Sequence, residues 1–310
     1  MTTARAGAAS YTGTLALTAL APLVWGSTYA ITTEFLPPDR PLFTALMRAL
    51  PAGLLLLAIT RVLPRGEWLW RAGVLGALNI GAFFPLLFLA AYRLPGGVAA
   101  VLGAAQPLFA LGLAVLLLGE RPTTRKVSAG VIGLFGVSLV VLRATAALDT
   151  VGVIAGLLGA VSMGAGVVLT KRWGRPEGVG PLAMTGWQLA AGGLMLLPLA
   201  LLVEGAPPAL DAEAIGGYLY LGLLGTAAAY ALWFRGLSRV PASSAALLGL
   251  LSPLSAAIIG WVALGQALSP IQVLGIAIAL GATLFGQLGG APKPVAPQLI
   301  PPAATPARAL

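Results

Sequence analysis

The sequence predicts an all-α polytopic membrane protein: ten transmembrane helices arranged as two inverted five-helix repeats, with both termini in the cytoplasm. Three observations lead to this fold class. The 310-residue chain is 58% hydrophobic and 9% charged, with a mean hydropathy of +0.95, whereas soluble chains carry about 25% charged residues. Its apolar runs are long enough to cross a bilayer. A segment of the first half recurs in the second half.

Ten apolar runs of about 20 residues, the length that a membrane span requires, follow one another along the chain. Short connections rich in proline, glycine and charge separate them, which excludes a sizeable soluble domain. The spans are placed at 14–33, 41–60, 68–91, 96–118, 126–143, 150–171, 180–203, 214–235, 241–264 and 271–289. The first run exceeds the apolar region of a signal peptide, so we expect it to be retained.

The basic residues are predicted to gather on one side of the membrane. With the N-terminus in the cytoplasm, most of the 18 lysine and arginine residues fall in cytoplasmic segments, as the positive-inside bias requires. The formal net charge of +9 is thereby explained without nucleic acid as a partner. The expected organisation is a cytoplasmic segment 1–13, repeats 14–143 and 150–289, and a disordered proline-rich cytoplasmic tail 290–310.

The two halves share a sequence pattern. RLPGGVAAVLGAAQPL at 93–108 aligns with RVPASSAALLGLLSPL at 239–254 at a shift of 146 residues, and spans 2 and 7 align more weakly at a shift of 140. Because each half holds an odd number of spans, the second half enters the membrane from the opposite side. Inverted repeats of this kind are typical of secondary transporters, whose substrate site lies near the midplane between the halves. The alternative is a duplicated anchor or assembly module.

The stretch LLLGERPTTRKVSAGVIGLFGVSLVV at 116–141, together with WGSTYA at 25–30 and the repeat, resembles EamA-type carriers of the drug/metabolite transporter superfamily. Within that family the chain is most similar to the YddG-type exporters of aromatic amino acids. The resemblance covers about residues 14–289. It implies ten helices, a central cavity and export from the bacterial cytoplasm across the inner membrane. The second half departs from the pattern, with Gly265-Gln266-Ala267 where the first has Gly119-Glu120-Arg121, so a transport role of Glu120 would break the two-fold symmetry.

Polar side chains inside the spans are the first candidates for substrate contact, because an unpaired polar group is costly in hydrocarbon. The candidates are the amides Asn79 and Gln106 and the hydroxyls of Ser162, Ser244, Ser252 and Ser255. The amides are suited to bind the carboxylate or ammonium group of a zwitterion. The alternative role for each is an interhelical hydrogen bond worth about 1 kcal/mol.

Aromatic rings inside the spans are the second class of candidates. Those expected to line the cavity are Trp25, Tyr29, Phe83 and Tyr230. An aromatic amino acid would stack on such rings, and a hydrophobic cation would sit over their faces. Trp25 and Tyr29 share a helix face at a spacing of four, and the shift of 146 pairs Tyr230 with Phe84. Simple packing is the alternative, which we favour for Trp187 and Trp233.

Two prolines and one arginine complete the candidates. Pro107 and Pro253 interrupt spans 4 and 9 at matching positions, and we interpret them as hinges, because proline removes a backbone donor and bends a helix. Arg48 is the one charge deep inside a span. Three roles are open for it: snorkelling to the interface, binding a substrate carboxylate, and bonding to neighbouring carbonyls.

The sequence predicts a carrier rather than an enzyme. It contains no cysteine and no histidine, which excludes Ser-His triads and metal sites built on these residues; no catalytic residue, metal or cofactor is expected. No Asp or Glu lies near the middle of a span, so facilitated diffusion or exchange is the predicted mechanism.

The substrate is expected to be an aromatic or apolar amino acid, alternatively a hydrophobic organic cation. A channel is the less favoured alternative, because it would need a ring of charged or carbonyl groups, whereas the expected lining is aromatic and two-fold. The oligomeric state is left open, and a monomer is compatible with this architecture.

Overall fold

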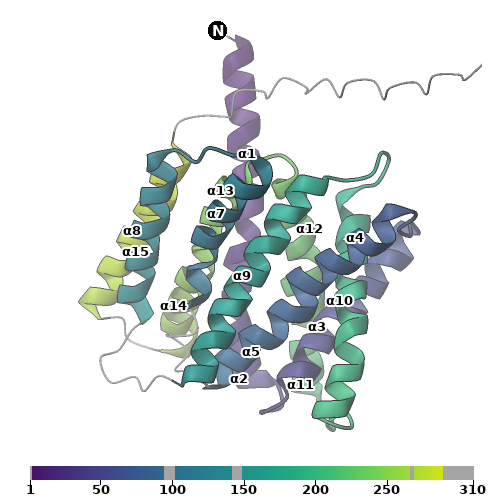
Figure 1. The fold of residues 1–310 in the computed structure, drawn as a ribbon. Helices are drawn as coiled ribbons and strands as arrows, with labels where there is room; N and C mark the ends of the chain where they lie inside the picture. The colour runs from purple at the N-terminus through teal and green to yellow at the C-terminus, as the bar shows by residue number, and fades with distance from the viewer. Residues whose placement is uncertain (1, 94–101, 142–148, 266–268, 289–310) are drawn as a thin grey trace, which may run out of the picture.

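The computed structural model describes residues 2–93, 102–141, 149–265 and 269–288, and every regular element in these ranges is a helix (Figure 1). The first half contains α1 (Thr2–Trp25), α2 (Ser27–Phe35), α3 (Pro41–Thr60), α4 (Glu67–Gly76), the π-helical η1 (Ala77–Ala82), α5 (Phe83–Arg93), α7 (Gln106–Leu118) and α8 (Thr124–Val141). The second half contains α9 (Thr150–Trp173), α10 (Pro181–Val203), α11 (Ala212–Gly222), the π-helical η2 (Leu223–Ala228), α12 (Ala229–Leu237), α13 (Ala242–Leu248), α14 (Leu251–Leu264) and α15 (Pro270–Gln287). The predicted all-α class is confirmed for the described residues.

Within the described residues, eight helices are long and apolar enough to cross a membrane. They are Tyr11–Thr32, Pro41–Thr60, Glu67–Ala90, Thr150–Trp173, Pro181–Val203, Ala212–Leu237, Ala242–Ala263 and Pro270–Gln287. The other two predicted spans, 96–118 and 126–143, lie partly outside the described residues; within these, they contain the shorter apolar helix Leu102–Leu118 and α8. Large apolar side chains cover the outside of the bundle, with Leu202 84% and Val262 71% exposed. Such a surface suits lipid rather than water.

The local structure repeats along the chain with the period found in the sequence. A shift of 146 residues carries the bounds of η1 onto those of η2, and the bounds of α8 onto those of α15. The same shift relates Gly119 and Gly265, which end α7 and α14 in the left-handed conformation with φ of 63° and 64°. The sequence duplication therefore has a counterpart in the backbone.

Equivalent helices of the two halves pack against each other in antiparallel pairs, α3 with α10 and α8 with α15 (Figure 1). Glycines allow the first pair its close approach. A Cβ atom at Gly53 would lie 2.4 Å from the backbone nitrogen of Ala190, and one at Gly193 would lie 2.7 Å from Cα of Leu50. Small residues at such contacts let membrane helices pack backbone to backbone.

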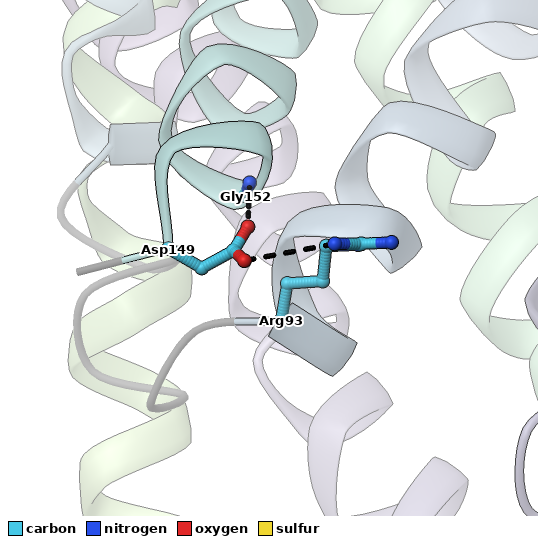
Figure 2. A network of polar contacts seen from close by, with 3 residues as sticks. All are labelled: Arg93, Asp149 and Gly152. Carbon is cyan, nitrogen blue, oxygen red and sulfur yellow. Dashed lines mark hydrogen bonds and ion pairs between the residues drawn. The ribbon is translucent and has the colours of Figure 1, made fainter. Parts of the chain in front are cut away.

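Carboxylates fix the ends of several helices. The first backbone N–H groups of α3 lack a cap from Arg40, and Glu204 at the end of α10 accepts them instead, from Leu42 at 2.6 Å and Phe43 at 2.9 Å. Asp149 caps α9 by accepting from the backbone N–H of Gly152 at 2.7 Å. Its second oxygen lies 3.6 Å from Nη1 of Arg93 at the end of α5 (Figure 2). The start of the second half is thereby tied to the third span of the first.

The predicted first span is divided at Gly26, between α1 and α2. A Cβ atom at Gly26 would lie 2.4 Å from Oγ of Ser255 and 2.6 Å from the carbonyl oxygen of Ser252. The hydroxyl of Ser255 donates to the carbonyl of Leu23 at 2.5 Å. The break therefore occurs where α14 crosses the first span most closely.

Candidate functional site

Aromatic rings gather where α1, α5 and α12 meet. The ring centroid of Trp25 lies 4.9 Å from that of Tyr230 and 5.3 Å from that of Trp233. Tyr230 also lies 6.3 Å from Phe84 and 5.7 Å from Phe234. Phe84, Tyr230 and Trp233 are at most 1% exposed. The rings form a closed cluster, called here the central aromatic cluster.

The other aromatic candidates lie at or near this cluster. The ring of Phe83 is partly buried and its centroid lies 5.8 Å from that of Phe84. Tyr29 lies in α2, one turn beyond the break at Gly26, and its side chain is outside the described residues. Trp233 packs within the cluster, and its indole Nε1 has no hydrogen-bond partner among the described residues. Trp187 packs elsewhere, against Trp68, and donates to the carbonyl of Val62 at 2.6 Å.

The π-helical segment η2 is held by side chains from the first half. Nε of Arg48 donates to the hydroxyl of Thr226 at 2.9 Å, and Nη2 donates to the carbonyl of Gly225 at 3.2 Å. The indole of Trp25 donates to the same carbonyl at 3.0 Å. The guanidinium also lies 4.8 Å from the centroid of the Phe84 ring. Of the three roles considered for Arg48, bonding to a neighbouring carbonyl is the one that the structure contains.

The segment η1 is held in the equivalent way by the second half. Nδ2 of Asn79 donates to Oε1 of Gln188 at 2.7 Å and lies 3.4 Å from the hydroxyl of Thr170. Asn79 is fully buried, and its Oδ1 has no hydrogen-bond partner among the described residues. Gln188 lies 140 residues after Arg48, and Gly225 lies 146 residues after Asn79. Each π-helical segment is thus bonded to a residue of the opposite half, Gln188 for η1 and Arg48 for η2, and these two residues are equivalent in the repeat. Turns of the π-helix are frequent at functional sites.

The predicted hinges follow breaks in their helices. The amide of Ala105 donates to the carbonyl of Leu102 at 3.2 Å, just before Pro107, and the amide of Gly249 donates to Ala246 at 3.0 Å, just before Pro253. Bonds of this i→i−3 type tighten a turn relative to the α-helix. Two helices that match in the repeat therefore both change their winding shortly before the predicted hinge proline, two residues apart in the alignment.

The remaining polar candidates have different environments. Gln106 is 9% exposed, and its Nε2 has no hydrogen-bond partner among the described residues. Ser252, which the shift of 146 pairs with Gln106, is partly buried. The hydroxyl of Ser162 donates to the carbonyl of Leu78 in η1 at 2.8 Å, which is the interhelical bond considered as its alternative role. Ser244 is 2% exposed and its carbonyl accepts from Gln287 at 2.9 Å.

Three residues of this site escaped the sequence analysis: Gln188, Gly225 and Thr226. For Gln188 a signal existed, because it is an amide inside span 7 and aligns with Arg48 at the weaker shift of 140. Gly225 takes part through its backbone carbonyl, which has no sequence signature. Among the described residues, no three His, Cys, Asp or Glu side chains come together to hold a metal ion.

A recess of about 270 Å³ opens between α9, α10 and α12, beside the contact of Asn79 with Gln188. Lys171, Arg175 and Gln188 are among the residues that line it. Gln188 is fully buried and is bonded to Asn79, so the recess adjoins the polar centre of the bundle.

The apolar exterior, the glycine-mediated helix contacts and the polar groups held in the interior define a multi-pass membrane protein. A family model described as the EamA-like transporter family matches residues 12–142 and again residues 150–286. The chain therefore belongs to the EamA-like transporter family and is a membrane transporter, which confirms the resemblance seen in the sequence.

Several relatives extend this assignment. The chain is 47% identical over 267 residues to Protein PecM of Dickeya dadantii, covering 86% of this chain and 90% of the relative. It is 31% identical over 291 residues to the uncharacterized inner membrane transporter YedA of Escherichia coli K12, covering 90% and 92%. It is 30% identical over 228 residues to a probable terminal-alkyne amino-acid exporter of Streptantibioticus cattleyicolor, covering 72% and 74%. A solved crystal structure shares the fold with a TM-score of 0.77 at 20% identity, covering 89% of this chain and 97% of the other.

Proposed function

We propose that the chain exports small amphipathic metabolites, foremost amino acids with aromatic or apolar side chains, across the bacterial inner membrane. The observation that carries this proposal is the closed aromatic and polar centre, held between equivalent helices of two halves that pack antiparallel. The printed name of the Streptantibioticus relative, a probable terminal-alkyne amino-acid exporter, supports an amino acid as the substrate. The relation to YedA, an inner membrane transporter, supports the location.

The transport cycle that we infer is alternating access of two inverted five-helix repeats, with ten spans and both termini in the cytoplasm. Contacts exchanged between the halves support it: α5 packs on α9 as α12 packs on α1, and α7 packs on α9 as α14 packs on α1. An approximate two-fold axis relates the members of each pair. Rocking of one half against the other then opens the centre to either side, with Pro107 and Pro253 as hinges.

The substrate site that we infer is built around the central aromatic cluster. Trp25, Tyr29, Phe83 and Tyr230 supply the rings on which an aromatic side chain stacks. Oδ1 of Asn79 and Nε2 of Gln106 have no hydrogen-bond partner among the described residues. The first is an acceptor for a substrate ammonium, and the second is a donor for a carboxylate. Ser162, Ser244 and Ser252 complete the lining with small hydroxyls. The centre is closed here, so these groups meet the substrate when the halves rock apart.

The mechanism that we infer is facilitated diffusion or exchange by a single copy of the chain. It follows from the sequence, in which no Asp, Glu or His lies near the middle of a span, since proton-coupled carriers commonly use such residues. The direction of net flux is then set by the gradient of the substrate and, in exchange, by that of the counter-substrate.

The test is reconstitution in liposomes with uptake of labelled tryptophan, phenylalanine and threonine, with and without a pH gradient. We expect saturable uptake that favours the two aromatic amino acids and does not respond to the pH gradient. Tyr230→Ala should reduce it about tenfold, whereas Tyr230→Phe keeps the ring and most of the flux. Trp261→Ala is the matched control, because Trp261 is 53% exposed on the outer surface.

Two results would contradict parts of this proposal. Flux of a lipophilic cation such as tetraphenylphosphonium, without amino-acid flux, would place the chain among multidrug carriers. Accumulation of an amino acid against its gradient, driven by an imposed pH difference, would replace facilitated diffusion by proton coupling.

A further inference from the structure

The recess between α9, α10 and α12 is lined by charged and by apolar residues. Lys171, in the last turn of α9, and Arg175, just after it, are cationic. Met184, Phe234 and Leu237 are apolar. A volume of about 270 Å³ is thus lined by two cations and by apolar side chains.

The two cations of the recess are bonded to neutral groups. The ammonium of Lys171 donates to the carbonyls of Leu237 at 3.2 Å and Val240 at 3.0 Å, and the guanidinium of Arg175 donates to the carbonyl of Val179 at 3.3 Å. An ammonium has three donors and a guanidinium has five, so both retain capacity for an anion. No Asp or Glu occurs among the described residues that line the recess.

One carboxylate lies near enough to act on Lys171. Glu120 attracts it electrostatically, but Oε1 of Glu120 accepts from the backbone N–H of Ala242 at 3.3 Å, and Glu120 also attracts Lys126, whose ammonium donates to Ser243 at 2.7 Å. Glu120 is therefore shared with the α12–α13 turn and a second cation. The charge facing the recess stays positive.

We propose that this recess binds the carboxylate of an amphipathic carboxylic acid, such as an amino acid with an apolar side chain. Lys171 and Arg175 hold the carboxylate, and Met184, Phe234 and Leu237 hold the apolar side chain. The inference rests on the proposed function, because it makes the recess the first binding site of the same carrier, ahead of the centre. A hydrophobic cation is excluded from this site by the two positive charges.

Binding in the recess takes place beside two parts of the structure. A carboxylate bound by the third donor of Lys171 lies next to the carbonyls of Leu237 and Val240, where α12 leads into the turn before α13. The recess is also lined by Gln188, which is bonded to Asn79.

The experiment compares two probes that differ only in the carboxylate, L-phenylalanine and 2-phenylethylamine. Binding to the full-length purified chain in detergent is measured by equilibrium dialysis for the wild type, Lys171→Gln, Arg175→Gln and the double variant. We expect the double variant to bind phenylalanine at least tenfold more weakly and phenylethylamine no more weakly than the wild type does. Arg172→Gln is the matched control, because Arg172 neighbours Lys171 but does not line the recess; its affinity should stay within about twofold.

The outcomes separate this inference from the proposed function. If the wild type carries phenylalanine in liposomes but the double variant binds it normally, the recess inference is wrong and the proposed function stands. If the wild type neither binds nor carries phenylalanine, both fail. Because Lys171 also holds the α12–α13 turn, Arg175→Gln provides a variant of an exposed residue whose effect does not depend on that turn.

An anionic lipid headgroup offers similar chemistry to the two cations. Dialysis is therefore repeated in phosphatidylcholine nanodiscs with and without phosphatidylglycerol. Phenylalanine binding that persists in both and depends on Lys171 and Arg175 supports the proposal. Variants that change only the retention of phosphatidylglycerol would identify a lipid site and overturn it.

Discussion

The two π-helical segments occupy equivalent places in the two halves, yet the contacts that hold them differ in charge. Arg48 bonds to Gly225 and Thr226 of η2, whereas Gln188, the equivalent of Arg48, bonds to Asn79 of η1. The backbone has kept its pattern because helices pack on it from both sides. A single polar contact needs only a donor and an acceptor, so its chemistry is free to diverge.

The charged contact is the more demanding of the two. An arginine at the middle of a membrane costs about 2.5–3.5 kcal/mol on insertion scales. Arg48 offsets this through its hydrogen bonds and the face of Phe84, 4.8 Å away. Gln188 carries no charge and needs only amide and backbone partners. We therefore expect the stability of the protein to depend more strongly on the contact of Arg48 with η2 than on the contact of Gln188 with η1.

The largest effect is expected from separating the two helices that carry both contacts. Gly53→Ala places a Cβ atom 2.4 Å from the backbone nitrogen of Ala190 on α10, where no flexible side chain can move aside. Overpacking typically costs about 1–3 kcal/mol, and a backbone contact belongs at the upper end. We expect a clear fall in the detergent-solubilised melting temperature. Gly193→Ala should act similarly, since its Cβ would lie 2.7 Å from Leu50.

The control for this substitution is Gly73→Ala in α4, where a Cβ atom meets nothing within 4 Å. Alanine favours a helix over glycine by up to about 1 kcal/mol, so this variant should be neutral or more stable. Equal melting temperatures for Gly53→Ala and Gly73→Ala would show that the α3–α10 contact is looser than the structure has it.

An intermediate effect is expected from removing the charged contact. Arg48→Ala leaves the hydroxyl of Thr226 without this donor and removes one of the two side-chain donors to the carbonyl of Gly225. An unmade buried hydrogen bond costs about 1–3 kcal/mol, so we expect a lower yield of monodisperse protein, with substrate preference unchanged in the molecules that fold.

Gln188→Ala is the companion variant for the neutral contact. Interhelical hydrogen bonds in membranes average about 0.6 kcal/mol, so its yield should fall less than that of Arg48→Ala. A larger loss for Gln188→Ala would reverse the comparison. Normal yield with altered substrate preference for Arg48→Ala would instead assign Arg48 to the substrate.

How far the sequence predicts this site depends on the kind of contact. The bilayer demands long apolar runs and satisfied backbone groups, so the helical class and the membrane location follow from composition alone. Asn79 stands out as an amide among apolar residues. Its partner Gln188 does not, because pairing them requires knowing which faces of η1 and α10 meet.

The π-helical turns could not be predicted at all. The segments ALNIGA at 77–82 and LLGTAA at 223–228 each lie inside a long apolar run and contain a single polar side chain, and neither contains a residue that signals a wider turn. The close approach at Gly53 was equally hidden, because the chain contains 41 glycines and few of them lie at a backbone contact. Such features arise from tertiary packing rather than from local preference.

The smallest effect on stability is expected from substituting Asp149, the cap at the start of the second half. Asp149 caps α9, while its Oδ2 lies 3.6 Å from Arg93. Asparagine caps a helix about as well as aspartate, so Asp149→Asn removes only the charge, worth about 0.3–1 kcal/mol through the helix dipole and the ion pair.

The melting temperature of Asp149→Asn should approach that of the wild type as salt is raised, since salt screens exposed charges. Asp149→Ala also loses the bond to Gly152 and should stay less stable at every salt concentration. If the two variants are equally stable at high salt, the capping bond contributes nothing. The start of the second half would then be held by helix packing alone.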